Sequence, residues 1–591
     1  MYFAIKAAPY INDGGPMALI NGLYSEIDRP FHFYLGRWTV KAVGITTFFY
    51  FIIAVVVYSN LKNYRHGEEH GSAKWASVHR LNKKYAAKER VFDDIDMWRQ
   101  NMILTHSARM GFDFYRPQHQ KNANTLIIGG PGTMKSRGYI GPNIMQMNSS
   151  MVITDPKGEL AKKYGNMLKN NGYRVVVFDI SKPEKSACYN PFVYFRNDKD
   201  VLQFVNNFFA ASEDKNAMKG EQIWDDGAKN LMLAFSYLLY HEAPAEEQTL
   251  GMITELLKAA EITEDNTMSA VDIIFMRLEE KYPDHPAVGY YKLYHKGAAK
   301  TLQSFQSTLS TRLSFFNLEA LVKLTNTDDI DICKLATEKT AVFCVTPDSD
   351  ASFNFLVGTL YQQMFQQLYD LADNVYNGPL PIHVRFLMDE FANIALPDDY
   401  QKILSTARSR NISFAIVLQD KSQIEKLYET LYKTIMACCS TWLFLGSNEK
   451  ETCEYISSLV GKETVTVKEY SKSEGRWTVN YRQQERDLIT PDEVRRKANE
   501  IAILIIEGED ALKDRKYDMK NHKYYKYVAE GKNLTRKKDP AVIFDWGSIA
   551  LSNGDVKQLD KYQGKLSNID SLQIKSGKVL SEEEIIRKYA A

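Results

Sequence analysis

Residues 125–137 read TLIIGGPGTMKSR, a strand-forming run followed by a glycine-rich loop. The loop ends in Lys135 and Ser136, where a helix is expected to begin. Backbone N–H groups of such a loop and the N-terminus of the next helix can surround phosphate groups. In this interpretation Lys135 contacts the β- and γ-phosphates of ATP, and the Ser136 hydroxyl binds Mg²⁺. A glycine-rich structural turn is the alternative.

One position departs from the usual phosphate-loop pattern. Gly129, Lys135 and Ser136 fit G-x-x-x-x-G-K-[ST], but Met134 stands where the second glycine is expected. Glycine adopts positive φ freely, whereas a side chain there costs on the order of 1–2 kcal/mol. Other glycines in the loop offer a compensating path. The expected nucleotide-binding residues are Gly129, Gly130, Gly132, Thr133, Lys135, Ser136 and Arg137.

A pair of carboxylates ends another apolar run, HVRFLMDE at 383–390. Alone, such a pair is commonly a solvated strand end. Beside a phosphate loop on one parallel sheet, Asp389 is expected to hold Mg²⁺ and Glu390 to polarise the attacking water. The two motifs together predict a Mg²⁺-dependent ATP hydrolase.

Three further polar residues follow the acidic pair. Arg408 and Arg410 lie in a predicted helix and can reach a γ-phosphate across a subunit interface, as arginine fingers do. A basic helix face is the alternative for each. Gln419 ends the next apolar run, where a polar side chain can sense water or γ-phosphate, although a glutamine at a strand end is otherwise unremarkable.

The soluble body is predicted to be an α/β fold with a parallel sheet. Continuous apolar runs of strand length alternate with helical sequence, which is typical of strands buried on both faces. The expected strands are 125–128, 151–155, 174–180, 341–346, 383–390, 413–419, 441–446 and 501–506. The expected divisions are a linker at 62–120, nucleotide-binding domain parts at 121–197 and 326–539, an all-α insertion at 198–325, and a tail at 540–591.

The stretch 42–61 is apolar and carries no charge. Its length corresponds to about 30 Å of helix, enough to cross a hydrocarbon core, and aromatic residues flank it. We expect one transmembrane helix, preceded by an extracytoplasmic or interfacial segment at 1–41. Lysines and arginines after the span favour a cytoplasmic body below the plasma membrane. A buried core helix is the alternative, and residues 16–24 are a weaker candidate for a second span.

Composition excludes several classes of protein. With 74 Lys and Arg against 73 Asp and Glu, the net charge is +1, so contact with nucleic acid requires a local patch. One candidate patch is 512–538, where ten basic residues alternate with tyrosines that can stack on unpaired bases. A solvated charged face is the bland alternative. Six cysteines, none in a CxxC pair, argue against a disulfide scaffold or a zinc site.

Several motifs, in this order, resemble those of the type IV coupling proteins of conjugation and type IV secretion, most of all those of Gram-positive bacteria. They are GSAKWA (71–76), DPKGEL (155–160), YNPF (189–192), WDDGAKNL (224–231), MDEFANI (388–394), LQD (418–420) and LITPDEVR (488–495). The resemblance implies a membrane-anchored, hexameric RecA-like ATPase. It also implies that the protein brings single-stranded DNA and its relaxase to the secretion channel proteins.

Matched residue by residue, the resemblance assigns Lys135 and Ser136 to the nucleotide loop and Asp389 and Glu390 to metal and water. It assigns Arg408 to the finger and Gln419 to the sensor. For Asp155, Lys157 and Glu159 of DPKGEL, a turn with a helix start competes with nucleotide sensing.

Two alternatives to a motor for single-stranded DNA remain open at this point. One is a receptor platform in which Met134 blunts hydrolysis. The other is a duplex DNA translocase of the chromosome-partitioning kind.

Overall fold

The computed structural model describes residues 5–6, 8–12, 15–26, 29, 31, 36–60, 68–87, 100–112, 121–212, 222–261, 268–347, 353–394, 396–397, 400–473, 476–530, 543–544, 546, 573–574 and 577–578. The chain divides into two compact units. One combines Met1–Ser72 with Lys462–Arg486, and the larger one combines Ala73–Gly461 with Asp487–Ala591.

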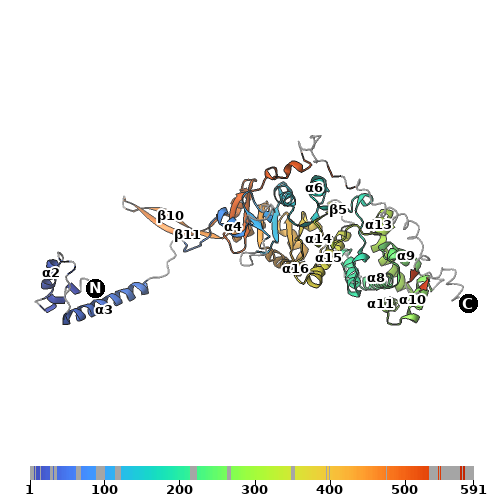
Figure 1. Cartoon of the computed structure of the whole chain (residues 1–591), viewed down its shortest axis with the longest axis horizontal. Coiled ribbons are helices and arrows are strands. Elements are labelled where there is room, and N and C mark those ends of the chain that lie inside the picture. Colours follow the sequence, from blue (N-terminus) through green and yellow to red (C-terminus); the bar gives the residue numbers. More distant parts are fainter. Residues whose placement is uncertain are drawn as a thin grey trace. The chain divides into compact units, whose positions relative to one another are not determined.

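The larger unit contains a nine-stranded sheet (Figure 1). Its spatial order is β13-β12-β9-β3-β8-β7-β4-β6-β5. In chain order the strands are β3 (Thr125–Gly129), β4 (Ser150–Thr154), β5 (Arg174–Asp179), β6 (Thr340–Val345), β7 (Val384–Met388), β8 (Ile412–Leu418), β9 (Thr441–Gly446), β12 (Ile501–Ile506) and β13 (Leu512–Arg515).

The predicted α/β class and parallel sheet are confirmed for seven neighbouring strands. From β9 to β5 each strand pairs in parallel with its neighbours, and every residue of β3, β4, β6, β7 and β8 is buried. The strand predicted at 501–506 is present as β12, but its predicted parallel direction is wrong, because β12 runs antiparallel to β9. The antiparallel edge strand β13 was not expected.

Two hydrophobic cores lie on opposite faces of the sheet, because side chains alternate along a strand. Ile127 of β3 packs into one core with Ile144 and Tyr164, while Leu126 packs into the other with Phe355 and Leu360. The helices of this unit outside the region 198–325 are α4 (Val78–Tyr85), α5 (Gly141–Gln146), α6 (Glu159–Asn170), α14 (Lys334–Thr337), α15 (Asn354–Asp370), α16 (Tyr400–Thr406), α17 (Lys421–Tyr428), α18 (Tyr432–Ala437), α19 (Lys450–Val460) and α20 (Pro491–Arg496).

The region 198–325 is helical and contains no strand among its described residues. Side chains of Asn197, Thr249 and Ser269 accept backbone hydrogen bonds and so begin three of its helices. Helix α8 packs against α11 and α12, and Figure 1 shows α8 to α11 gathered at one end of this unit. The helices are α7 (Asp198–Ala211), α8 (Gln222–Glu242), α9 (Leu250–Ala259), α10 (Ala270–Lys281), α11 (Pro286–Tyr294), α12 (Ala299–Leu313) and α13 (Glu319–Leu324).

A small hairpin lies within the stretch that was expected to be a linker. Strands β1 (Asn101–Ile103) and β2 (Arg109–Gly111) pair antiparallel. The buried side chain of Asn143 in α5 bonds both the N–H and the carbonyl of Ile103. These contacts join the hairpin to the helix that follows the phosphate loop. Two further short strands are β14 (Gln573–Ile574) and β15 (Gly577–Lys578).

The smaller unit contains helices α2 (Pro16–Ser25) and α3 (Arg37–Asn60) and a long hairpin of β10 (Lys462–Ser473) and β11 (Arg476–Asp487). Within α3, the stretch Arg37–Ser59 contains an 18-residue window with a mean hydropathy of 2.2, of which 6% is buried. Among the described residues, this is the one helix long and apolar enough to cross a membrane. The helix begins five residues before the predicted span. Helix α2 has ten residues, about 15 Å, which is too short to cross.

Candidate nucleotide-binding site

The glycine-rich loop follows β3 and leads into a π-helical turn, η4 (Ser136–Ile140), and then α5. Thr133 Oγ1 donates a 2.7 Å hydrogen bond to the Gly130 carbonyl, which closes the loop. A Cβ on Gly129 would lie 2.4 Å from Thr133 Oγ1, so this closure requires a glycine. The Gly130 N–H donates to the Gly446 carbonyl at 2.7 Å and attaches the loop to the end of β9.

Met134 adopts the left-handed backbone conformation, with φ of 70°. The loop therefore needs at this position the conformation that glycine adopts without strain. Gly132, two residues earlier, also has a positive φ of 75°. The Met134 side chain is not among the residues that line the adjoining cavity, so the methionine strains the loop without filling the space beside it.

The loop and the acidic pair meet at the carboxyl edge of the sheet. Ser136 Oγ donates to Asp389 Oδ2 at 2.5 Å, although 253 residues separate the two in sequence. Strand β8 lies between β3 and β7, so the parallel register of the three strands brings both strand ends to the same edge. Lys135 Nζ donates to the Gly129 carbonyl at 2.7 Å, which turns its ammonium back onto the loop.

Glu390 and Gln419 form a second contact at this edge. Gln419 Nε2 donates to Glu390 Oε1 at 2.9 Å, and the Gln419 N–H donates to Gln423 Oε1 at 2.8 Å. Glu390 has a φ of 76°, so its backbone is strained in the way that often accompanies functional residues. Glu390, which was predicted to polarise the attacking water, is therefore hydrogen-bonded to Gln419, which was predicted to sense water or γ-phosphate.

These groups line one cavity of about 570 Å³. Seven of the sequence-predicted residues lie on its wall: Gly132, Lys135, Ser136, Arg137, Asp389, Glu390 and Gln419. Gly130 and Thr133 line a neighbouring cavity of about 290 Å³, and Gly129 is buried in β3. Backbone N–H groups, a lysine, a hydroxyl and carboxylates around one space fit a metal-bound polyphosphate.

Asp155 also lines this cavity, where DPKGEL left its role open. Its Oδ2 accepts a 2.8 Å hydrogen bond from the Ala161 N–H at the start of α6, as the turn interpretation expects. Burial raises the pKa of Asp155 to about 6, with Asp389 adding a smaller repulsion. The residue thus combines a capping role with a place on the cavity wall.

Three residues on the wall of this cavity were not predicted from the sequence. Met519 and Glu530 line it, and Glu530 forms a 3.0 Å ion pair with Arg137. Tyr164 of α6 lines it as well. No motif marks these residues, because only the tertiary fold brings them to the loop.

Comparison with known proteins identifies the family of this chain. A family model described as Type IV secretory system Conjugative DNA transfer matches residues 74–542. The chain belongs to this family. The family predicted from the motifs is thereby confirmed.

Individual relatives also match most of the chain. Protein VirD4 of Rhizobium radiobacter is 22% identical over 560 residues, covering 93% of this chain and 77% of that protein. Conjugal transfer protein TraG of Escherichia coli is 25% identical over 411 residues, covering 64% of this chain and 62% of that protein.

Solved structures of a coupling protein show the same fold. The bacterial conjugative coupling protein TrwBdeltaN70 in its unbound form matches with a TM-score of 0.55 at 16% identity, covering 78% of this chain and 96% of that one. The plasmid coupling protein TrwB in complex with the ATP analogue ADPNP matches with a TM-score of 0.54 at 15% identity, covering 76% and 93%.

The two candidate arginines differ in their surroundings. Arg410 is bound within its own chain, because its guanidinium pairs with Asp373 at 2.6 Å and lies over the Tyr369 ring. Arg408 is exposed, and neither arginine is among the residues that line the 570 Å³ cavity.

The basic segment 512–538 contributes to the loop in a way that its composition did not indicate. Lys516 is buried, and its Nζ donates to the Thr133 carbonyl at 2.8 Å and to Asn499 Oδ1 at 3.0 Å. Burial, with the charge of Lys497, lowers the pKa of Lys516 to about 7. Tyr517 is also buried, with the Arg109 guanidinium over its ring. The side chains of Lys516 and Tyr517 are therefore buried in the protein interior. Residues 531–538 of the segment lie outside the described residues.

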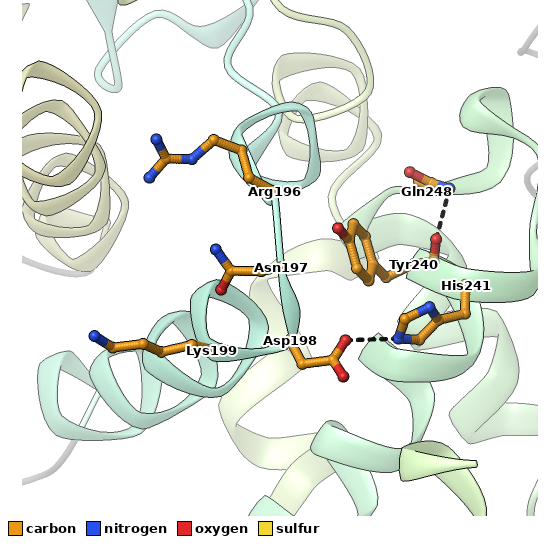
Figure 2. A pocket seen from close by; sticks show the side chains of 7 residues that line it. All are labelled: Arg196, Asn197, Asp198, Lys199, Tyr240, His241 and Gln248. Carbon is orange, nitrogen blue, oxygen red and sulfur yellow. Dashed lines mark hydrogen bonds and ion pairs between the residues drawn. The ribbon is translucent and has the colours of Figure 1, made fainter. Parts of the chain in front are cut away.

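A second large cavity, of about 700 Å³, lies at the start of α7 in the helical region. Figure 2 shows its wall, where His241 Nε2 lies 2.7 Å from Asp198 Oδ1 and Gln248 donates to the Tyr240 carbonyl at 3.3 Å. None of the residues predicted for nucleotide chemistry lies here.

Proposed function

We propose that this protein is a membrane-anchored ATPase that couples DNA substrates to a type IV secretion channel. Family membership supports the role in conjugative DNA transfer. The structural relative TrwB is known in complexes with ADPNP and with ADP and Mg²⁺, which supports the same ligands here. The single observation that carries the proposal is the contact between Ser136 and Asp389 beside a cavity of nucleotide size.

The residues around this contact fit Mg²⁺ and a triphosphate. Ser136 and Asp389 present oxygen atoms, the ligands that Mg²⁺ prefers, and would hold the ion between them. When bound, Mg²⁺ neutralises charge on the β- and γ-phosphate oxygens. Lys135 leaves the Gly129 carbonyl to bind the same phosphates, and the loop N–H groups surround them.

Glu390 and Gln419 carry the proton chemistry in this proposal. Glu390 orients the attacking water and accepts its proton, while Gln419 fixes the carboxylate through Oε1. Glu390 combines a strained backbone with a place on the cavity wall, as functional residues often do.

The wider assembly is part of the same proposal, and the resemblance to the family supports it. Helix α3 anchors the chain as a single span in the plasma membrane, with the larger unit in the cytoplasm. Subunits form a homo-hexameric ring in which Arg408 of one subunit completes the site of its neighbour. Single-stranded DNA with its relaxase is the cargo, and the channel proteins receive it.

The test is ATP turnover by the full-length protein in lipid nanodiscs. We expect Lys135→Ala to lose nucleotide binding, and Glu390→Gln to bind ADPNP normally but to lose about 100-fold or more in turnover, the usual contribution of a general base. Glu429→Gln is the matched control, because Glu429 is an exposed glutamate with a positive φ of 38° outside the cavity. Unchanged turnover in both site variants excludes the assigned site.

The strain at Met134 favours one competing function, a receptor platform that binds nucleotide but hydrolyses it poorly. Met134→Gly removes a cost on the order of 1–2 kcal/mol from the loop. If the protein is a motor, the wild type turns over ATP and the glycine variant gains about tenfold at most. Negligible wild-type turnover that glycine restores supports the platform instead. Stimulation by duplex rather than single-stranded DNA supports a duplex translocase.

A further inference from the structure

The hairpin of β10 and β11, called the ribbon here, has two different faces. Each strand has twelve residues, so the ribbon is about 40 Å long. Lys468 Nζ lies 5.7 Å from the centroid of the Tyr481 ring, which places both residues on one face. Because side chains alternate along a strand, Tyr470 and Val479 lie on that face too. Tyr470 and Tyr481 are 65% and 66% exposed, and Val479 is 41% exposed.

The opposite face carries charged pairs together with Val465 and Val467. Arg482 lies 4.0 Å from Glu469, and Arg486 lies 3.5 Å from Glu463, so cations and carboxylates neutralise one another across the strands. The aromatic face has one charged pair near its base, Lys462 with Glu485 at 3.2 Å, but its described central positions carry no carboxylate. These positions are Thr466, Lys468, Tyr470, Val479, Tyr481 and Gln483.

The base of the ribbon is hydrogen-bonded to His70 and Gly71, which follow helix α3 in the chain. The His70 N–H donates to Thr464 Oγ1 at 2.9 Å, and Thr464 Oγ1 donates to the Gly71 carbonyl at 3.1 Å. Helix α3 ends at Asn60, ten residues before His70. Ten residues of backbone span at most about 35 Å. The ribbon is thus long enough, and tied closely enough, to reach the surface of a bilayer that α3 crosses.

We infer that the aromatic face of the ribbon lies on the headgroup region of an anionic lipid bilayer, an inference that rests on the proposed membrane anchor. Tyrosine rings favour the membrane–water interface, where the ring is apolar and the hydroxyl is hydrated. Lys468 adds attraction to anionic headgroups, and its nearest described neighbours on that face, Thr466, Tyr470 and Val479, carry no carboxylate. Tyrosines with lysine also suit single-stranded nucleic acid. The short tie to α3 favours lipid, because covalent connection keeps the ribbon near the bilayer.

The experiment places a fluorescent label on each face at the same depth along the ribbon. Tyr481→Cys labels the aromatic face, and Asn480→Cys, an exposed neighbour on the other face, is the matched control. Cys333→Ser and Cys438→Ser remove the two cysteines that are not buried. The full-length protein is placed in nanodiscs of phosphatidylglycerol and phosphatidylcholine, with and without lipids that carry a quencher near the headgroup. ATP turnover checks that each labelled protein is folded.

We expect the quencher lipids to lower the fluorescence at position 481 about twofold, because an interfacial group lies at the headgroup–acyl boundary. The label at position 480 is expected to change little. Equal quenching at both positions, or none at 481, overturns the inference. A response at 481 to a single-stranded oligonucleotide but not to quencher lipid assigns the face to nucleic acid instead. Failure of the protein to enter nanodiscs at all contradicts the proposed anchor, which is a separate result.

Discussion

Met134 and Lys516 act on the same peptide unit of the phosphate loop. Met134 takes a φ of 70°, and the carbonyl just before it, that of Thr133, accepts a hydrogen bond from the Lys516 ammonium. A side chain at positive φ is unfavourable by itself and persists where the surroundings determine the backbone. Lys516 supplies part of that determination, together with the Gly130 N–H bond to Gly446. The departure from the glycine pattern is therefore accompanied by a buried cation.

We expect Lys516 to make nucleotide affinity depend on pH. Burial and the charge of Lys497 lower its pKa to about 7, and a bound triphosphate is expected to raise it, since an anion favours the ammonium form. Binding then takes up a proton, so affinity is highest below pH 7 and falls as pH rises above 7. A single group limits the fall to about tenfold per pH unit. Calorimetric titration with ADPNP at pH 7.5, in two buffers of different ionisation enthalpy, measures the proton uptake.

Two variants isolate this effect from other titrating groups. Lys516→Met is expected to bind ADPNP more weakly below pH 7 and to lose most of the proton uptake. Lys520→Met, an exposed lysine four residues away, is expected to behave as the wild type. Proton uptake that survives in Lys516→Met assigns it to another group, such as Lys497.

The element that presents the loop is the short helical stretch of η4 and α5, which packs on α6. Gly141, at their junction, lets the two elements approach, because a Cβ there would lie 2.1 Å from Tyr164 Oη. Tyr164 is both buried and part of the cavity wall. The packing of α5 on α6 and the shape of the nucleotide cavity are therefore linked at one side chain.

Gly141→Ala tests this link. The added methyl group forces α5 and α6 apart, and overpacking of this kind lowers the free energy of unfolding by about 1–3 kcal/mol. ADPNP affinity is expected to fall with it, because Tyr164 moves. Gly289→Ala in α11 is the control, since a Cβ there meets no atom within 4 Å. Thermal melting and ADPNP binding measure both effects, and an unchanged affinity in Gly141→Ala separates packing from the cavity.

The elements that could be predicted from the sequence are those marked by one strong local pattern, such as a continuous apolar run. Strand β7 is apolar except for the buried Arg385 and is followed directly by Asp389, so both the strand and its acidic end can be predicted from sequence. Strand β12 is equally apolar, but burial on both faces does not reveal its antiparallel direction. The ribbon was not predicted, because strands such as KETVTVKEYSKS mix charges with β-branched residues and lack a continuous apolar run. Glu530 carries no local signal, since only the fold brings it to Arg137.

At the scale of the whole molecule, the proposed hydrolytic site has no unpaired arginine among the described residues on the wall of its own cavity. The wall holds the groups that we propose for the phosphates, the metal and the water, together with Lys157 and Lys163, but its one arginine among the described lining residues, Arg137, is paired with Glu530. Transfer of a γ-phosphate commonly needs a further cation to stabilise the transition state. In a ring, each interface joins two different surfaces, so a neighbour can supply this cation. We propose exposed Arg408, which the resemblance to the family assigns to the finger, for that role.

Mixing two inactive variants tests whether Arg408 acts between subunits. Arg408→Ala keeps the phosphate loop and loses the finger, while Lys135→Ala keeps the finger and loses nucleotide binding, so each alone is expected to be inactive. Co-assembled in equal amounts, they create some interfaces that pair an intact loop with an intact Arg408. Random mixing makes these about a quarter of all interfaces, so about a quarter of wild-type ATP turnover should return if interfaces act independently. Arg410→Ala replaces Arg408→Ala in the control and is expected to lower the melting temperature while keeping turnover. A mixture no more active than its components shows that Arg408 does not act across the interface.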